Sequence, residues 1–443
     1  MIKVRAKMLG GAMAAAVVLA LAACGSGTST AGSTTEDGAQ ASAMASASGN
    51  ITFWSSVANM KPVVDAFNQS HPNIKVNYEV TPSAAPGYAK LSTALQAGNA
   101  PDVATIEYYR LPGYASNGDL QPISDYIGQA DLGKFSGQVR GLVSLGGKSW
   151  ALPYDAPPMV FYYRKDLLAD AGVSTAPATW QEFEADARKL KSVHPDAYLA
   201  SFYPDDPSTF AGLAWQAGAK WFSTEGDSWN VNLGDAATQK VAGFWQKLID
   251  DKLVKVEQSF SDQWSQDLQK STMAGVVGAS WSATGIVSRT KGQEGKWAVA
   301  ELPNWGTPAD SMLGGSTFAI TKTSKNPAAA AAFIQWMTTS PDAIKARGNV
   351  GSAWLAYPGL SDIAKANFST APFGGQDIFS VFQKASSTVS DGWNWGPKIT
   401  ATYTPLADGF GRLATGGTIS EAINSAQTAT VSDLKNSGLS VKG

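Results

Sequence analysis

Residues 50–107 read NITFWSSVANMKPVVDAFNQSHPNIKVNYEVTPSAAPGYAKLSTALQAGNAPDVATIE. The string ITFW predicts a short strand, and three apolar residues then fall on one face of a helix over 58–68. Apolar and polar residues alternate over 74–80, which is the period of a second strand. A helix over 88–97 and the apolar strand VATI follow. This order predicts an α/β fold with a mostly parallel sheet flanked by helices.

Ligands of such sheets sit beyond the carboxyl ends of the parallel strands. The first predicted strand ends at Trp54, Ser55 and Ser56, and the third runs into Glu107, Tyr108 and Tyr109. These residues are therefore candidates for a binding site. The competing interpretation is structural, with Trp54 as a core residue and the loop after Glu107 as a solvated turn.

Two capping boxes mark helix starts farther along the chain. Thr179 precedes Glu182 by three residues, and Thr418 precedes Glu421 by the same spacing. Asn326 and the proline after it predict the start of an Ala-rich helix.

The N-terminus predicts export. Three basic residues within the first seven precede an uncharged stretch that ends in Leu-Ala-Ala-Cys at Cys24. This is the pattern of a signal peptide over 1–23, and the stretch is shorter than the roughly 18 to 20 residues that span a membrane. The end of the stretch resembles the lipobox of bacterial lipoproteins. It predicts lipidation of Cys24 and a location on the extracellular face of the cytoplasmic membrane.

Composition narrows the remaining possibilities. Residues 24–49 are mostly Gly, Ser, Ala and Thr, which predicts a flexible linker. The rest of the chain is long enough for two domains. The net charge of −2 argues against nucleic acid binding, and the two His and single Cys argue against a His/Cys metal site. No cofactor motif is evident, and we expect a monomer. The 15 Trp would suit a ligand with flat apolar faces.

The order of four segments resembles the family of extracellular solute-binding proteins that serve carbohydrate ABC importers. These segments are PDVATIEYYRLPGYASNGDLQPI over 101–123, ALPYDAPPMVFYYRKDLLADAG over 151–172, TWQEFEADARKL over 179–190 and LGGSTFAITKTSKNPAAAAAFIQWM over 313–337. Arg164 stands where the family usually has asparagine, and the segment 348–357 lacks the family's usual proline. The resemblance covers most of the chain, from about residue 50 to 435.

The resemblance implies a two-lobed binding protein of class II, with a mostly parallel sheet in each lobe and a ligand cleft between the lobes. Lobe 1 would hold 50–157 and 315–351, and lobe 2 would hold 158–314 and 352–443. The chain would cross between the lobes near 155–159, 314–318 and 348–354. The protein would capture a mono- or oligosaccharide by closing the lobes and deliver it to the permease subunits of an importer. It would not be an enzyme.

Acidic oxygens and aromatic rings are the groups that hold sugar hydroxyls and apolar sugar faces. Asp155, next to Tyr154 between two prolines, is the first candidate for a hydroxyl acceptor. Each aromatic candidate has a competing interpretation as a core residue, and each glycine or acid as a structural turn. The predicted ligand-binding set is Trp54, Ser55, Ser56, Glu107, Tyr108, Tyr154, Asp155, Trp281, Gly315, Ser316, Trp354, Trp393, Asn394 and Trp395.

Two other functions compete with sugar capture. A binding protein for another solute, such as a polyamine or glycerol phosphate, would share the fold. A phosphate ligand would require basic side chains in the site, and the candidate loops contain few basic residues besides Arg110. A secreted glycosidase would need two carboxylates about 5 to 9.5 Å apart, a role open to Glu107 and Asp155.

Overall fold

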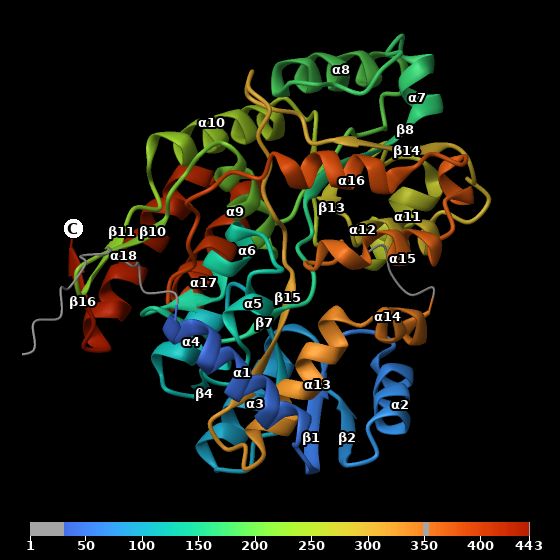
Figure 1. The fold of residues 1–443 in the computed structure, drawn as a ribbon. Coiled ribbons are helices and arrows are strands. Elements are labelled where there is room, and N and C mark those ends of the chain that lie inside the picture. Colours follow the sequence, from blue (N-terminus) through green and yellow to red (C-terminus); the bar gives the residue numbers. More distant parts are fainter. Residues whose placement is uncertain (1–30, 349–353, 443) are drawn as a thin grey trace, which may run out of the picture.

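Two β-sheets, each covered by helices, organise the computed structural model, which describes residues 31–348 and 354–442 (Figure 1). The predicted signal peptide and Cys24 lie outside the described residues. The larger sheet has the order β2-β1-β3-β15-β4, with β7 also paired to β15. Its strands are β1 (Gly49–Ser55), β2 (Ile74–Val80), β3 (Val103–Glu107), β4 (Leu120–Gln121), β7 (Leu152–Pro153) and β15 (Ser316–Thr321).

Strands β1, β2 and β3 are parallel, as the sequence predicts. Their side chains alternate across the sheet, so that Ile51 and Phe53 on β1 are buried while Thr52 is exposed. Strand β15 then inserts beside β3 in the antiparallel direction. The larger sheet is therefore mixed.

The second sheet has the order β13-β8-β14, and both of its pairings are antiparallel. The prediction of a mostly parallel sheet in each lobe is wrong for this lobe. Strand β8 is almost wholly buried, and a continuous apolar run carries no signal of strand direction. The strands are β8 (Met159–Arg164), β13 (Gly275–Ala279) and β14 (Trp297–Glu301).

Helices cover both sheets. Those of the larger sheet are α2 (Met60–Ser70), α3 (Ala84–Gln96), α4 (Leu111–Ser116), α5 (Gln129–Leu132), α6 (Gly137–Leu142), α13 (Pro327–Thr339) and α14 (Pro341–Arg347). Those of the second sheet are α7 (Lys165–Asp170), α8 (Trp180–Val193), α11 (Asp262–Lys270), α12 (Ser282–Arg289), α15 (Ser361–Ala366) and α16 (Ile378–Ser387). Both predicted capping boxes are present, at Thr179 before α8 and at Thr418 before α18.

A further helical layer extends the second lobe on the side nearest the C-terminus (Figure 1). It contains α9 (Pro207–Gln216), α10 (Ala236–Asp250), α17 (Ile399–Phe410) and α18 (Ile419–Asn436). The small strands are β5 (Ser144–Leu145), β6 (Lys148–Ser149), β9 (Ser201–Phe202), β10 (Phe222–Glu225), β11 (Ser228–Val231), β12 (Lys255–Val256) and β16 (Ser440–Lys442).

The chain passes between the two sheets more than once. It leaves the larger sheet after β7, enters the second sheet at β8, and returns from β14 to β15. After α14, which packs on α2, it leads to α16, which packs on β8 and β14. The predicted third crossing falls largely on 349–353, outside the described residues. The molecule therefore has two lobes, each discontinuous in sequence, while the residue limits predicted for them stay a prediction.

The prediction of a flexible linker over 24–49 is wrong for its second half. Residues Ala31–Ala45 form helix α1, which packs against α13 and α5. Met44 is buried in the core of lobe 1. Asp37 accepts a hydrogen bond from the amide of Gln129 at 2.7 Å, and the amide of Gln40 donates to the carbonyl of Ser124 at 3.0 Å. These tertiary contacts stabilise a helix that the composition alone does not predict.

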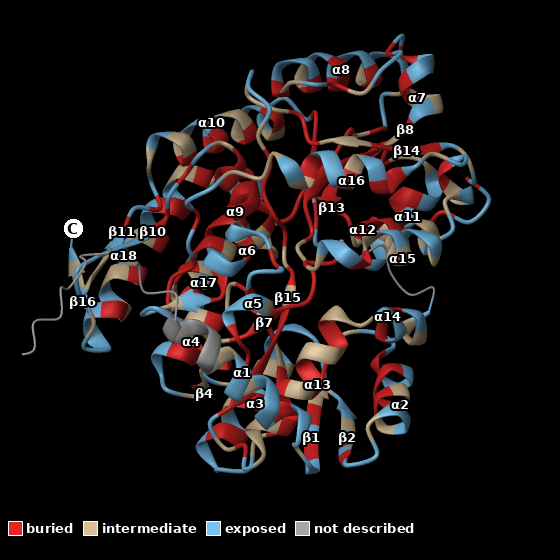
Figure 2. Cartoon of the chain, viewed as in Figure 1, coloured by how far each residue is buried: buried red, intermediate tan, exposed pale blue. Residues whose placement is uncertain are grey.

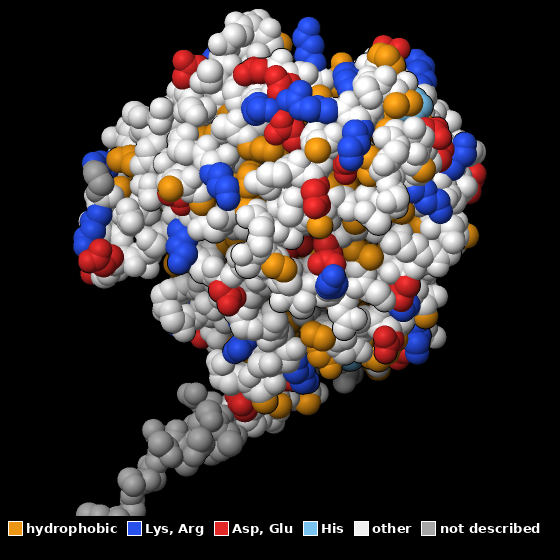
Figure 3. All heavy atoms as spheres, turned by 90° about the horizontal axis from the view of Figure 1, so that it is seen from above, with side chains coloured by type: hydrophobic (Ala, Val, Ile, Leu, Met, Phe, Trp, Pro, Cys, Tyr) orange, Lys and Arg blue, Asp and Glu red, His pale blue; other side chains and the backbone are white. Residues whose placement is uncertain are grey.

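Most of the 15 Trp side chains lie inside the molecule. Trp180, Trp215, Trp221, Trp245 and Trp297 are almost completely buried. Figure 2 shows buried residues along both sheets and on the inward faces of the surrounding helices. On the face viewed in Figure 3, acidic and basic side chains are interspersed, so this face carries no field of one sign.

Candidate functional site

The carboxyl end of β3 supplies the lobe 1 side of the site. The hydroxyl of Tyr88, from α3, donates to Oε2 of Glu107 at 2.9 Å, and the amide of Glu107 donates to the same hydroxyl oxygen at 3.0 Å. Burial raises the pKa of Glu107, while hydrogen bonds from Tyr88 and Tyr109 and the charge of Arg110 lower it. A carboxylate is thus held near the gap between the lobes.

Lobe 2 meets this strand end with aromatic rings. Tyr109 stacks on Tyr403 of α17, with ring centroids 5.7 Å apart, and it meets Trp395 edge to face at 6.2 Å. Nη1 of Arg110 donates to Oγ1 of Thr400 at 2.5 Å. These contacts join the two lobes directly.

Two polar groups of lobe 2 act electrostatically on the Glu107 carboxylate or are acted on by it. The negative charge of Asp206, which caps α9, adds to the rise in the pKa of Glu107. Burial raises the pKa of Tyr403, with contributions from Tyr109, Asp206 and Glu107. The hydroxyl of Tyr403 is buried and has no hydrogen-bond partner within 31–348 and 354–442. A buried hydroxyl without a partner is costly, and a ligand would satisfy it.

Asp155 lies where the chain first crosses between the lobes. Its Oδ1 accepts from the amide of Ser316 at 2.6 Å, and its carbonyl oxygen accepts from the hydroxyl of Tyr108 at 3.0 Å. Burial raises its pKa to about 6; the Ser316 amide and Arg347 act in the opposite direction, and Glu107 adds to the rise. A Cβ on Gly315, whose φ is +100°, would come within 2.8 Å of the Tyr108 ring, so only glycine fits beside it.

Trp281 borders the site from lobe 2. Its ring is partly exposed, and its Nε1 donates to the carbonyl of Leu313 at 2.9 Å. The ring helps to line a small cavity together with Asp206 and Phe260. On the other side, Tyr88 and Arg110 line a groove of about 840 Å³ that runs between α3 and α4 of lobe 1 and α17 and α18 of lobe 2.

Several predicted site residues are held inside the protein. The Ser55 hydroxyl is fully buried, accepting from Oγ1 of Thr105 at 2.7 Å. Tyr108 and Tyr154 are buried rings. Trp393 is a core residue that stacks on Trp215 with centroids 5.4 Å apart. These side chains pack inside the protein and have almost no exposed surface, so they are not available to contact a ligand.

The other predicted residues lie at the margins of the site. Nζ of Lys90 lies 4.3 Å from the centroid of the Trp54 ring. Trp54 and Ser56 together line a small cavity. Asn394 is exposed and borders another cavity with Trp395. Trp354 is partly buried, and its carbonyl accepts from the amide of Ala156 at 2.8 Å.

Sequence reasoning missed four residues of the site. Tyr88 lies in the second turn of α3, the helix that follows the parallel strand β2, so the strand-end rule points to this part of the chain. Asp206 precedes a proline as a helix cap, which is a structural signal only. Tyr403 and Arg347 lie within or at the end of helices, and nothing in their local sequence distinguishes them.

The described residues contain no group of three or more His, Cys, Asp or Glu placed to hold a metal ion. None of the helices in the described ranges combines the length and apolar character that crossing a bilayer requires.

Comparison with known proteins places the chain in a family. The profile described as "Bacterial extracellular solute-binding protein" matches residues 54–344. The lactose-binding protein of Rhizobium radiobacter is 26% identical over 355 residues, which are 75% of this chain and 81% of that protein.

Two solved structures are similar over nearly their whole length. The galacto-N-biose-/lacto-N-biose I-binding protein of Bifidobacterium longum, in complex with lacto-N-biose, has a TM-score of 0.79 and 28% identity, covering 89% of this chain and 99% of that one. The ABC transporter associated binding protein from B. animalis subsp. lactis, in complex with β-1,6-galactobiose, has a TM-score of 0.78 and 30% identity, covering 89% and 100%. The profile match, together with these two structures, shows that this chain belongs to the bacterial extracellular solute-binding protein family.

Proposed function

We propose that this protein captures a carbohydrate between its lobes and delivers it to the membrane subunits of an ABC importer. The observation that carries the proposal is the convergence at one gap of the Glu107 carboxylate with the rings of Tyr109 and Tyr403. Relatives named for lactose, lacto-N-biose and galactobiose support a sugar as the ligand.

The energetics of the site suit a neutral polyhydroxylated ligand. A hydrogen bond to a charged group contributes about 1.5 to 3 kcal/mol, and aromatic contacts add about 0.5 to 1.5 kcal/mol beyond area burial. A dissociation constant near 1 μM requires about 8 kcal/mol. Glu107, Asp155, the unpartnered hydroxyl of Tyr403 and two or three rings supply enough groups for this affinity.

We further propose that Cys24 carries the lipid anchor, that the protein works as a monomer on the outer face of the cytoplasmic membrane, and that it binds without chemical turnover. Lobe closure would then be the signal that the importer reads, because a ligand shifts the equilibrium only by its preference for the closed form.

Tyr403→Phe tests the site with little risk to the fold. The hydroxyl that it removes has no protein partner within the described residues, so the melting temperature should stay the same or rise. Calorimetry with the best sugar from a glycan panel should find at least about a fivefold loss of affinity, roughly 1 kcal/mol.

Tyr162→Phe is the matched control. The Tyr162 hydroxyl donates to the carbonyl of Ala279 at 2.8 Å in the core of lobe 2, so its loss should lower stability and leave affinity unchanged. Equal affinity of Tyr403→Phe and the parent chain would remove the inter-lobe site from the proposal. Release of shortened sugars from an oligosaccharide at catalytic turnover would replace capture with glycosidase activity.

A further inference from the structure

The two lobes contact each other along one edge of the gap through neighbouring residues of each lobe. Tyr109 stacks on Tyr403 with ring centroids 5.7 Å apart, and Nη1 of the next residue, Arg110, donates to Oγ1 of Thr400 at 2.5 Å. Thr400 and Tyr403 are three residues apart on α17, so their side chains share one face of this helix. A two-residue segment of lobe 1 thus contacts a single helical face of lobe 2.

Lobe 1 holds the Arg110 side chain in place. Cζ of Arg110 lies 4.9 Å from the centroid of the Tyr88 ring and 5.4 Å from that of the Tyr109 ring, within the range of cation–π attraction. The Tyr88 hydroxyl is in turn bonded to Glu107, and the charge of Arg110 lowers the pKa of that carboxyl group. A guanidinium ordered in this way loses little entropy when it reaches a partner on the other lobe.

The hydrogen bond between Arg110 and Thr400 depends on the distance between the lobes. The two residues are 290 positions apart in the chain, Arg110 at the start of α4 and Thr400 in the first turn of α17. Side-chain groups about 3.6 Å apart are no longer hydrogen-bonded, so a shift of α17 away from α4 by about 1 Å breaks this contact. The contact therefore stabilises the closed lobes and contributes nothing once they part.

Water reaches the pair from one side. Thr400 is exposed, Arg110 is half-buried, and both border the groove of about 840 Å³ between the lobes. The guanidinium therefore keeps part of its hydration when the lobes meet, and the cost of desolvating its charge is small. Partial hydration also weakens the hydrogen bond, so its loss should change rates by several-fold rather than by orders of magnitude.

We propose that Arg110 and Thr400 are positioning residues for sugar capture, which hold the closed lobes together and so set the rate at which bound sugar leaves. We call this pair the latch. The inference rests on the proposed function and assigns the control of release to residues of the same gap. The competing role for Arg110 is direct contact with the sugar, because its Nε is buried without an acceptor among the described residues.

Thr400→Val removes one half of the latch at an exposed position, so the melting temperature should stay that of the parent. Stopped-flow fluorescence of the full chain with each binding sugar of the glycan panel should find dissociation at least fivefold faster and association within twofold of the parent, about 1 kcal/mol of affinity. Release requires the lobes to separate, whereas the sugar enters while they are apart. Because the latch joins protein to protein, the acceleration should be the same for every sugar.

Arg110→Lys, the second variant, keeps a positive charge beside Glu107 and loses the planar group that reaches Thr400. It should accelerate release by a similar factor. Combined with Thr400→Val, it should release sugar no faster than Arg110→Lys does alone, since both changes remove the same contact.

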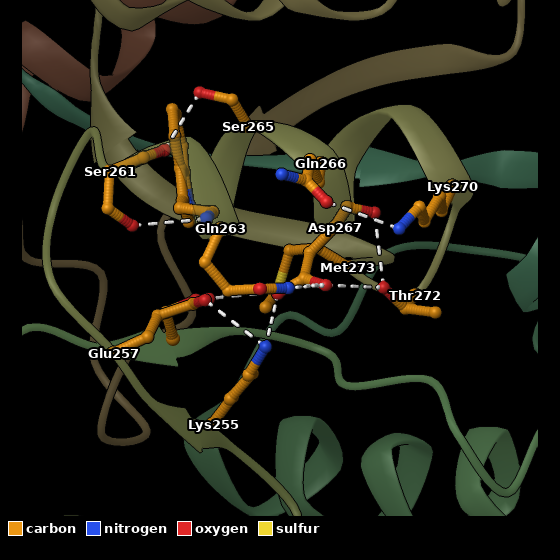
Figure 4. Close-up of polar contacts among 12 residues, drawn as sticks. Lys255, Glu257, Ser261, Gln263, Ser265, Gln266, Asp267, Lys270, Thr272 and Met273 are labelled. Carbon is orange, nitrogen blue, oxygen red and sulfur yellow. Dashed lines mark hydrogen bonds and ion pairs between the residues drawn. The ribbon is translucent and has the colours of Figure 1, made fainter.

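Thr272→Val is the matched control. Figure 4 shows Thr272 beside Asp267, to whose Oδ1 its hydroxyl donates at 3.0 Å, in a polar network with Gln263 and Lys255 that lies wholly within lobe 2. This variant also removes a threonine hydrogen bond to a charged group, but the bond joins no lobes. The melting temperature should fall, while both rate constants stay at those of the parent.

Three results would overturn the latch. They are an unchanged dissociation rate in Thr400→Val, effects of the two variants that multiply in the double variant, and an acceleration confined to some of the sugars. The last two results would make these side chains contacts of the ligand instead. In each case the protein still binds sugar, and the proposed function stands. If no sugar in the panel binds, the proposed function fails together with the latch.

Discussion

Asp155 is a carboxylate whose burial works against the fold at neutral pH. Its pKa is raised from 3.8 to about 6, so the folded chain holds the proton more tightly than the unfolded chain does. Between about pH 4 and pH 6 its contribution to the free energy of unfolding therefore falls as the pH rises. A structural role alone would not select a charge here, which supports a role in binding.

Asp155→Asn should remove this pH dependence. The amide oxygen of asparagine can still accept from the Ser316 amide, so the crossing keeps its hydrogen bond. Relative to the parent, the variant should gain about 2 to 3 kcal/mol on going from pH 4 to pH 7.5, as measured by urea unfolding. The exposed Asp65, in Asp65→Asn, is the control and should change little at either pH. Equal differences at the two pH values would contradict the prediction.

How far single residues could be predicted depended on their neighbours in the sequence. Glu107 and Asp155 follow or precede recognisable elements, so their place at the gap was predictable. Trp393 lies in a loop whose polar sequence predicts exposure. Its ring nevertheless packs against Trp215 and Trp221 in the core. Tyr403 shares α17 with one other ring, Phe410, and nothing in the local sequence marks it as a site residue. Only the approach of lobe 1 brings it against Tyr109.

At the scale of elements, the strands and the capped helices were predictable from the sequence. The packing of helix α1 against the rest of lobe 1 was not. The five elements from β1 to β3 follow the periodicity of the sequence closely. Helix α1 was missed because its Ala, Ser, Thr and Gly residues make a weak apolar stripe. Its partners α13 and α5 are separate in the sequence, so the contacts that hold it have no local signature.

Asp37→Ala tests the docking of α1. The carboxylate of Asp37 satisfies the first amides of α5, and loss of such a cap costs about 1 kcal/mol. Hydrogen exchange should find the amides of 38–45 protected in the parent chain and faster in the variant. Exchange in the parent at the rate of a free peptide would contradict the docked helix.

At the scale of the molecule, the two lobes approach closely at Gly113. A Cβ on this residue would lie 2.8 Å from the carbonyl oxygen of Pro397 in lobe 2, and a backbone atom cannot swing away. Gly113→Ala should therefore disfavour the closed arrangement and weaken sugar binding about fivefold, roughly 1 kcal/mol. Small-angle scattering should find a larger radius of gyration with sugar present than for the parent.

Gly141→Ala is the matched control, because a Cβ there meets nothing within 4 Å. It also lies in a short helix of lobe 1, so any general effect of removing a helical glycine should appear in both variants. Identical scattering and affinity for the two variants would show that the contact at Gly113 does not govern closure.

Strand β15 has a consequence for how the chain comes to be folded. It lies between β3 and β4, yet the ribosome makes it only after every strand of the second sheet. Until residue 321 has emerged, β3 and β4 present open edges that invite pairing with other chains. The nascent polypeptide must therefore be kept from collapsing prematurely, and maturation of the first lobe waits on synthesis of most of the second.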